Sequence, residues 1–489
     1  MVRCFTFKTF VFFAIFHLSI WYSNLILAQD FTSKKFGIQT VKSNIIYGIA
    51  TNYLGSSDTL KLDLYKPSGN DNIQRPLIVL NHGGAWVGGD KTESGIVAMA
   101  KEFAQRGYVV ASVNYRLGTH KANWALTPFQ KDVNAGFHAV YIADSAEIFR
   151  ANYRAMHDLK GAIRFLKARH ALDSTCSEAV FVGGESAGGF NALNVAFLDL
   201  NSEKPASCDS ISDVPMPQSN LQDNYPGGKV TLAQLKRPNL GSVEGSLNLN
   251  SYNAKVKGVI NMFGAFLSEA VSNNWVQGSD TPLVYLFHQS CDGIVPCKAA
   301  IILSPLSVNC NLGYTPFHYK YPIAYGSCAL KTYFSSGSPK IKLLKTEIFP
   351  CDDIIFPLAD CIRFAQNGSY HYTINIPQRC DSIAKFIAAT TVKSVKNCNN
   401  SASIKKMNKN QPLISPNPNT GTFKISGIDS HRIQQISITD VLGKTVNFEW
   451  KNSDTLTISD PFNHNLVFVS ITSNNQTQVN RIILINEAR

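Results

Sequence analysis

The segment Gly184-Glu185-Ser186-Ala187-Gly188 constrains the fold most, because it joins a buried apolar run, Ala179–Val182, to a helix-like stretch. A serine hydroxyl is a weak nucleophile until a base takes its proton, so a reactive serine must stand on a sharp turn that an imidazole can reach. Small residues at positions 184, 187 and 188 permit such a turn, since larger side chains would collide with the strand. The pattern predicts a strand, a tight turn carrying an exposed Ser186, and a helix.

A second segment, His82-Gly83-Gly84-Ala85-Trp86, directly follows a predicted strand at Pro76–Asn81. Attack by serine on an ester places negative charge on the former carbonyl oxygen, and preorganised backbone N–H groups stabilise that charge. Glycines let the chain turn so that its N–H groups point inward. We expect an oxyanion-binding loop here, in which His82 shapes the loop and is not the base. A plain glycine turn is the alternative interpretation.

A serine nucleophile needs a histidine, and the histidine needs an acid that holds its tautomer. The predicted strand Leu283–His288 runs into Gln289-Ser290-Cys291-Asp292-Gly293-Ile294-Val295-Pro296. The strand-end aspartate with its D-x-x-V-P continuation resembles that of α/β-hydrolase esterases, which implies that Asp292 is the acid and leaves His288 as a packing residue. Asp280 and Asp352 are the substitutes if Asp292 is only a solvated loop residue.

Two histidines of the main domain follow Asp292 in the sequence, His318 and His371. We favour His371 as the base, because the small-residue loop Asn367–His371 resembles the loop that carries the catalytic histidine in that family, and because it follows a predicted last strand at Ile341–Phe349. It lies 22 residues beyond Phe349, with two cysteines between, which predicts an inserted, disulfide-bearing excursion. His318 stays open as the alternative base.

Taken together, these motifs resemble those of α/β-hydrolase carboxylesterases and lipases, over residues 40–395. The resemblance implies a mostly parallel sheet with helices on both faces and a catalytic set of Ser186, Asp292 and His371. It also implies that backbone N–H groups bind the oxyanion, namely those of Gly83, Gly84 and Ala187.

Hydrophobic periodicity agrees with an α/β fold. Helices are expected at Ser94–Arg106 and Ser145–His170. Strands are expected at Leu60–Tyr65, Pro76–Asn81, Tyr108–Asn114, Ala179–Gly183, Val256–Phe263, Leu283–His288 and Ile341–Phe349. Gly88-Gly89-Asp90-Lys91 and Asn114-Tyr115-Arg116-Leu117 are also familiar from the hydrolase group, and we expect both to support packing and loops.

The beginning of the chain and its cysteines indicate export. Arg3 and Lys8 precede an apolar stretch that ends at Ala28, so residues 1–28 are predicted to be a secretory signal peptide, with an uncleaved membrane anchor as the alternative. Ten of the 11 cysteines lie beyond it, without C-x-x-C or H-E-x-x-H spacing, which favours disulfides over a metal site. Their connectivity cannot be read from the sequence, although close pairs such as Cys351 with Cys361 are candidates.

The charge of the chain is mildly basic. The formal net charge of +12 becomes +10 once Arg3 and Lys8 leave with the signal peptide. Because no long basic run occurs and no basic residues alternate with stacking aromatics, we expect no nucleic-acid partner.

The composition changes after Cys398, where residues 399–411 are predicted to form a polar, lysine-bearing linker. The following segment, Leu413–Phe423, closely resembles the start of the C-terminal sorting domain used by type IX secretion. The resemblance implies a small β-sandwich over residues 412–489, recognition by the type IX machinery, and delivery to the cell surface or release. An ordinary carbohydrate-binding or immunoglobulin-like module is the alternative.

The sequence therefore predicts a secreted serine carboxylic-ester hydrolase, with a catalytic domain over residues 29–398, that works through an acyl-enzyme without a metal or organic cofactor. Its substrate would be a small-molecule, lipid or polysaccharide ester. Two other functions stay open. One is a non-catalytic surface binding or adhesion protein on a hydrolase scaffold. The other is a serine peptidase of the same fold.

Overall fold

The structure of the protein is a computed structural model, in which the chain divides into two compact units that meet between Cys398 and Asn399. The structure describes residues 30–38, 41–69, 74–120, 142–215, 234–249, 251–276, 281–304, 321–336, 341, 343–351, 366–404, 413–415, 421–426, 433–440, 443–452, 454–461, 466–473 and 476–483.

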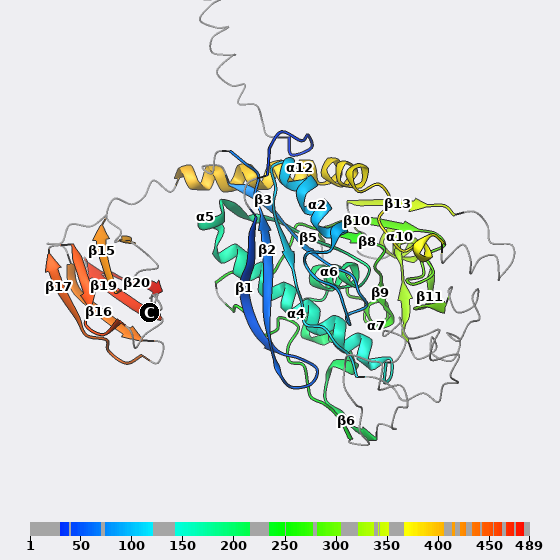
Figure 1. The fold of residues 1–489 in the computed structure, drawn as a ribbon, viewed down its shortest axis with the longest axis horizontal. Coiled ribbons are helices and arrows are strands. Elements are labelled where there is room, and N and C mark those ends of the chain that lie inside the picture. Colours follow the sequence, from blue (N-terminus) through cyan, green and yellow to red (C-terminus); the bar gives the residue numbers. More distant parts are fainter. Residues whose placement is uncertain are drawn as a thin grey trace, which may run out of the picture. The chain divides into compact units, whose positions relative to one another are not determined.

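An eight-stranded sheet forms the centre of the first unit, in the order β1-β2-β4-β3-β5-β8-β10-β13 (Figure 1). These strands are β1 (Lys42–Thr51), β2 (Ser57–Tyr65), β3 (Arg75–Asn81), β4 (Val109–Val113), β5 (Thr175–Glu185), β8 (Gly258–Met262), β10 (Leu283–Gln289) and β13 (Leu344–Phe349). β2 runs antiparallel to β1 and β4, and the other neighbours pair in parallel. The predicted mostly parallel sheet is confirmed, and each predicted strand is present. The edge strand β1 was not predicted.

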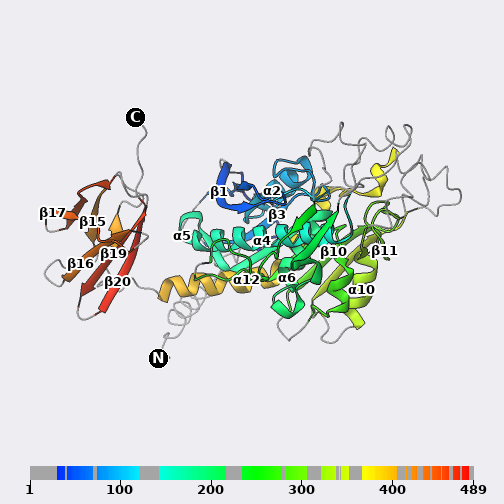
Figure 2. The same cartoon turned by 90° about the horizontal axis from the view of Figure 1, so that it is seen from below.

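Helices cover both faces of this sheet. Leu77 and Val79 of β3 pack in one hydrophobic cluster with α4 (Ala146–Ala168) and α6 (Ala187–Phe197). Ile78 and Leu80 pack in a second cluster with α2 (Ser94–Gln105) and α12 (Ile376–Ile404). Because successive strand residues point to opposite faces, this alternation buries the sheet between two helical layers, as Figure 2 shows. The two predicted helices are present to within two residues.

Smaller elements complete the first unit. Two additional sheets have the orders β11-β12-β9 and β6-β7. The remaining elements are α5 (His170–Asp173), η2 (Asn201–Glu203), η3 (Ala206–Cys208), β6 (Ile211–Pro215), β7 (Gln234–Arg237), β9 (Phe266–Leu267), α7 (Ser268–Ser272), β11 (Ala299–Ile301), β12 (Ile323–Tyr325), α10 (Ser327–Ser336) and η5 (Gly368–Tyr370). The last helix, α12, continues to Ile404, so the first residues of the expected linker are helical.

Three disulfides cross-link the described part of the first unit: Cys176–Cys398, Cys291–Cys351 and Cys297–Cys328. The suggested pairing of Cys351 with Cys361 is wrong, because β10 and β13 are neighbours in the sheet and bring Cys291 and Cys351 together after their ends. Cys361 lies outside the described residues. Disulfide chemistry itself, expected from the cysteine count, is confirmed.

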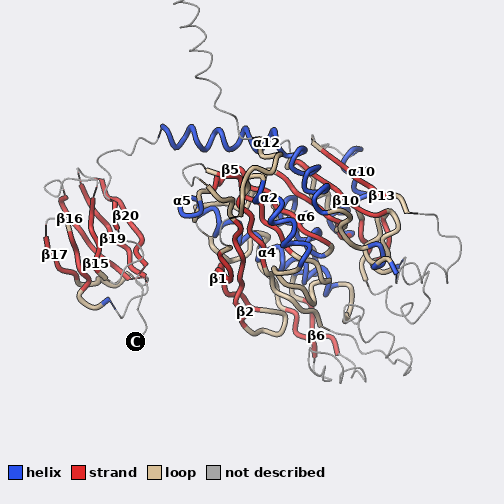
Figure 3. Tube along the Cα trace, turned by 45° about the horizontal axis from the view of Figure 1, so that its top comes forward, coloured by secondary structure: helices blue, strands red, loops and turns tan. Residues whose placement is uncertain are grey.

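The second unit consists mainly of strands (Figure 3). One antiparallel sheet has the order β14-β15-β18-β17 and another has the order β16-β19-β20. Their bounds are β14 (Leu413–Ser415), β15 (Thr422–Ser426), β16 (Ile433–Asp440), β17 (Phe448–Asn452), β18 (Thr455–Ile458), β19 (Leu466–Ser473) and β20 (Gln476–Ile483). Both sheets contribute to one core, with Phe423 and Leu456 from the first and Ile438 and Val469 from the second. This arrangement fits the expected small β-sandwich.

Among the helices that the structure describes, none is both long and apolar enough to cross a membrane.

Candidate active site

Ser186 lies on the sharp turn between β5 and α6. Its backbone has a left-handed φ of 53°, which residues with a side chain rarely adopt. The turn is held by Asn81, whose amide nitrogen donates to the carbonyls of Gly183 (2.8 Å) and Gly188 (3.0 Å). A Cβ atom on Gly188 would lie 2.4 Å from the backbone oxygen of Asn81. The predicted strand, turn and helix are therefore present, with small residues required where the chain crosses itself.

The predicted oxyanion loop follows β3 and lies against the serine. A Cβ atom built on Gly83 would be 3.2 Å from the Cβ of Ser186, so this part of the loop is adjacent to the nucleophile. Gly84 has a φ of +92°, and a Cβ atom there would collide with the oxygen of Gly88 at 2.2 Å. The N–H groups of Gly83, Gly84 and Ala187 donate to no acceptor within the described parts of the chain. Within those parts of the chain the three groups are unengaged, as an oxyanion site requires.

The other two candidate residues meet Ser186 from neighbouring strands. Asp292 follows β10, His371 lies beyond β13, and both strands point the same way as β5. Nδ1 of His371 lies 2.6 Å from Oδ2 of Asp292, and Nε2 lies 2.7 Å from Oγ of Ser186. Because the carboxylate only accepts, Nδ1 carries the imidazole proton and Nε2 accepts the serine hydroxyl. The structure thus brings Ser186, His371 and Asp292 into one hydrogen-bonded row.

Asp292 is fully buried and receives hydrogen bonds on both oxygens. Oδ1 accepts from the backbone N–H groups of Ile294 and Val295, each at 2.9 Å. Oδ2 accepts from His371 and lies 3.3 Å from Nε2 of His288. Burial alone would raise the pKa of Asp292, but the charge and hydrogen bonds of these two histidines hold it below its usual value of 3.8. The carboxylate is therefore ionised throughout the neutral range.

His288 does more than pack at the strand end. It is fully buried, and its Nδ1 accepts from the backbone N–H of Ser327 at 3.3 Å. The proton therefore sits on Nε2, which donates to the carbonyl of Val295 at 2.9 Å and also faces Asp292. His288 consequently orients the Asp292 loop. The sequence offered one signal for this role, a polar residue at the end of an otherwise apolar strand.

The loop that carries His371 is tied to its surroundings at three points. The N–H of Gly293 donates to the carbonyl of Ser369 at 2.9 Å, which joins the loop to that of Asp292. The Thr373 hydroxyl donates to the carboxylate of Glu185, the residue before the nucleophile. The ring of Phe263 packs edge-on against the His371 ring, with 4.7 Å between centroids. Sequence reasoning missed these three supports, which depend on residues far apart in the chain.

The substitutes for the acid and the base cannot be placed. His318, Asp280 and Asp352 lie outside the residues that the structure describes.

Comparisons with known proteins agree with the two units. The BD-FAE family model matches residues 62–154, which contain the oxyanion loop, and the model of the secretion system C-terminal sorting domain matches residues 413–486. The first unit therefore resembles an α/β-hydrolase in its fold, and the second matches a secretion system C-terminal sorting domain.

Individual proteins share short or distant similarity with this chain. The isoprenylcysteine alpha-carbonyl methylesterase ICME of Arabidopsis thaliana is 35% identical over 81 residues, and the match spans 17% of each protein's length. The apo form of Thermogutta terrifontis esterase 2 is 15% identical, with a TM-score of 0.39 over 73% of this chain and 96% of that one. The same esterase phosphorylated by paraoxon is 14% identical, with a TM-score of 0.36 over 64% and 82%.

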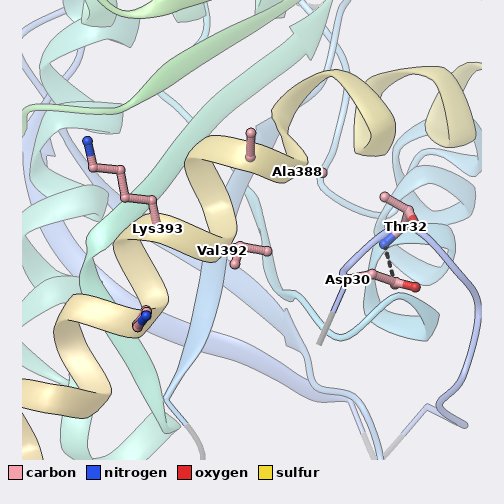
Figure 4. A pocket seen from close by; sticks show the side chains of 7 residues that line it. Asp30, Thr32, Ala388, Val392 and Lys393 are labelled. Carbon is pink, nitrogen blue, oxygen red and sulfur yellow. Dashed lines mark hydrogen bonds between the residues drawn. The ribbon is translucent and has the colours of Figure 1, made fainter. Parts of the chain in front are cut away.

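The described parts of the chain contain no group of three or more His, Cys, Asp and Glu side chains placed to hold a metal ion. A separate pocket lies between the N-terminal segment and α12, lined by residues that include Thr32, Ala388, Val392 and Lys393, with Asp30 accepting a hydrogen bond from the Thr32 N–H (Figure 4). It includes none of the residues around Ser186.

Proposed function

We propose that this hydrolase is an exported serine carboxylic-ester hydrolase that works through an acyl-enzyme. The observation that carries the proposal is the uninterrupted row of hydrogen bonds from Ser186 through His371 to Asp292. A serine hydroxyl bonded to an imidazole whose other nitrogen faces a buried carboxylate is the arrangement that activates serine as a nucleophile. The free N–H groups beside Ser186 supply the second requirement, a site for the charge that develops on the carbonyl oxygen.

The reaction follows from these positions. As Ser186 Oγ bonds to the ester carbonyl carbon, its proton passes to Nε2 of His371, and the carbonyl oxygen becomes an oxyanion next to the N–H groups of Gly83, Gly84 and Ala187. The imidazolium then returns the proton to the leaving alcohol, which departs and leaves an acyl-serine. Water enters, gives a proton to His371, and releases the carboxylic acid while the serine regains its proton. Asp292 keeps the imidazole in its productive tautomer throughout.

The route out of the cell rests on the ends of the chain. We propose that residues 1–28 are a cleaved signal peptide, residues 29–398 the catalytic domain, residues 399–411 the linker and residues 412–489 the sorting domain. The match to a secretion sorting domain supports recognition by a type IX machinery and delivery to the cell surface or the medium. The cross-linked first unit supports an oxidising destination, since disulfides persist outside the cytoplasm.

The similarity to a plant methylesterase supports an ester of a small alcohol as substrate. Lipid and polysaccharide esters are further members of the same class. Their selection depends on the residues that line the acyl and alcohol sites.

The experiment that tests the proposal compares hydrolysis of ester and amide substrates by the full-length protein and by Ser186→Ala. We expect rapid hydrolysis of 4-nitrophenyl acetate, little hydrolysis of the matching anilide, and loss of both in the variant. A protein that is inert toward short, long and carbohydrate-linked esters would contradict the proposal and favour a binding function. Preference for the anilide would favour a peptidase.

A further inference from the structure

Tyr115, from the segment expected to support packing and loops, contacts the oxyanion loop directly. It follows β4 and is buried. Its hydroxyl lies 3.1 Å from the carbonyl oxygen of His82 and 2.9 Å from that of Gly83. Its ring stacks on the His82 ring, with 4.4 Å between centroids and 16° between planes. One side chain therefore holds two consecutive peptide groups of the loop.

Those two peptide groups contain the N–H groups assigned to the oxyanion. The carbonyl of His82 shares its peptide with the N–H of Gly83, and the carbonyl of Gly83 shares its peptide with the N–H of Gly84. Because a trans peptide is planar, its C=O and N–H point in opposite directions. A partner that fixes both carbonyls on one side of the loop thereby fixes both N–H groups on the other, the side available to a ligand.

We propose that Tyr115 is a positioning residue for ester hydrolysis, because its hydroxyl anchors the carbonyls of His82 and Gly83 and so aims the N–H groups of Gly83 and Gly84 at the substrate carbonyl oxygen. The inference rests on the proposed function. It deepens that function by naming what holds the donors in place.

One further contact supports this role. Nδ1 of His82 lies 2.9 Å from the same Gly83 carbonyl, so the imidazole that stacks on Tyr115 acts on the same peptide. Burial raises the pKa of Tyr115 well above its usual value and outweighs the hydrogen bond with Asn191, which lowers this pKa. The phenol therefore keeps its proton at every assay pH. Gly84 itself adopts a φ of +92°, which other residues avoid, and its carbonyl accepts from the backbone N–H groups of Val87 and Gly88.

The test uses Tyr115→Phe in the full-length protein, which removes the hydroxyl and keeps the ring. Tyr153→Phe is the matched control, because Tyr153 is also buried and its hydroxyl donates at 3.0 Å to a backbone carbonyl, that of Gly241, outside the oxyanion loop. Both variants lose one buried hydrogen bond and should lose similar stability. Rates are expressed per active site titrated with a fluorophosphonate, so that misfolded protein does not contribute.

For Tyr115→Phe we expect kcat for 4-nitrophenyl acetate to fall about tenfold or more, with KM changed less than about twofold, since loss of a whole oxyanion donor costs about 100-fold or more. Tyr153→Phe should keep the wild-type kcat. A short alkyl trifluoromethyl ketone provides the second measurement. Ser186 adds to its carbonyl, the proton passes to His371, and the adduct oxygen becomes an oxyanion. In Tyr115→Phe the inhibition constant of this ketone should rise by the same factor by which kcat/KM for the ester falls.

Three outcomes overturn the inference. One is an unchanged kcat in Tyr115→Phe, another is an equal fall in both variants, and the third is a lower kcat with an unchanged inhibition constant. If the wild-type protein neither hydrolyses esters nor reacts with the fluorophosphonate, the proposed function fails and this inference fails with it. An active wild type with an unaffected Tyr115→Phe contradicts the inference alone.

Discussion

Replacing Asp292 by asparagine should nearly abolish activity while leaving the fold intact. The amide oxygen of the new side chain would take the place of Oδ1, which accepts two backbone N–H groups at 2.9 Å. The opposite orientation of the amide would place its NH₂ group against those two buried N–H donors. Leaving them without an acceptor would cost about 1–3 kcal/mol each. The NH₂ group therefore occupies the position of Oδ2, which lies 2.6 Å from Nδ1 of His371 in the wild-type protein.

That position inverts the hydrogen bonds of the imidazole. Nδ1 must now accept, so the proton moves to Nε2, which points a donor at Ser186 and no longer accepts its proton. Loss of the productive tautomer lowers kcat by about 10⁴, or roughly 5 kcal/mol. The assay is release of nitrophenolate from 4-nitrophenyl acetate, with unfolding followed by circular dichroism.

Two variants serve as controls for this prediction. Asp173→Asn alters another buried carboxylate, which pairs with Arg169 beside α5. Asp352→Asn alters the substitute acid. Both should keep wild-type kcat. An Asp292→Asn variant that folds and retains more than about a tenth of wild-type kcat would refute the reasoning, because an imidazole held in the other tautomer cannot take the serine proton.

Three more predictions concern the base and stability. His371→Ala should no longer be phosphonylated at Ser186 by a fluorophosphonate, whereas His318→Ala should react normally. The reverse result would move the base to His318. Burial, aided by nearby cations, lowers the pKa of His157 to about 3, so the folded protein resists its protonation. As the pH is lowered from 6.5 to about 3, the free energy of unfolding should then fall by about 1.4 kcal/mol per pH unit, because the unfolded chain binds this proton and the folded protein does not. A urea-unfolding midpoint that does not change with pH, or the same pH dependence in His157→Asn, would contradict this. Replacing both Cys176 and Cys398 by serine should lower the free energy of unfolding by roughly 5 kcal/mol, because their disulfide joins residues 222 positions apart. An unchanged midpoint of urea unfolding would contradict this prediction.

The sequence predicts the elements whose apolar residues are periodic and buried. β3 is buried along its full length and α4 carries a long apolar stripe, so both are evident from pattern alone. β1 escapes the pattern because it lies at the sheet edge and most of its residues are exposed or half-exposed. The end of α12 resembles a linker because it is rich in asparagine and serine, yet it remains helical to Ile404.

The site divides in the same way. Ser186, Asp292 and the glycine loop lie at strand ends that local sequence marks, so the sequence singles them out. The partner of Cys351 depends on which strands are neighbours, and that adjacency is not encoded locally. The contacts of His288, Thr373 and Tyr115 likewise join residues 7 to 188 positions apart, and they emerge only when the chain is folded.

Formation of an acyl-enzyme on Ser186 is tested most directly by rapid mixing with 4-nitrophenyl acetate, followed by peptide mass spectrometry of the acid-quenched protein. We expect a burst of nitrophenolate approaching one per active site and an acetyl group on the peptide that contains Ser186. Ser186→Ala should show neither. Hydrolysis with the same turnover in Ser186→Ala, or acetylation confined to another residue, would contradict the acyl-enzyme mechanism.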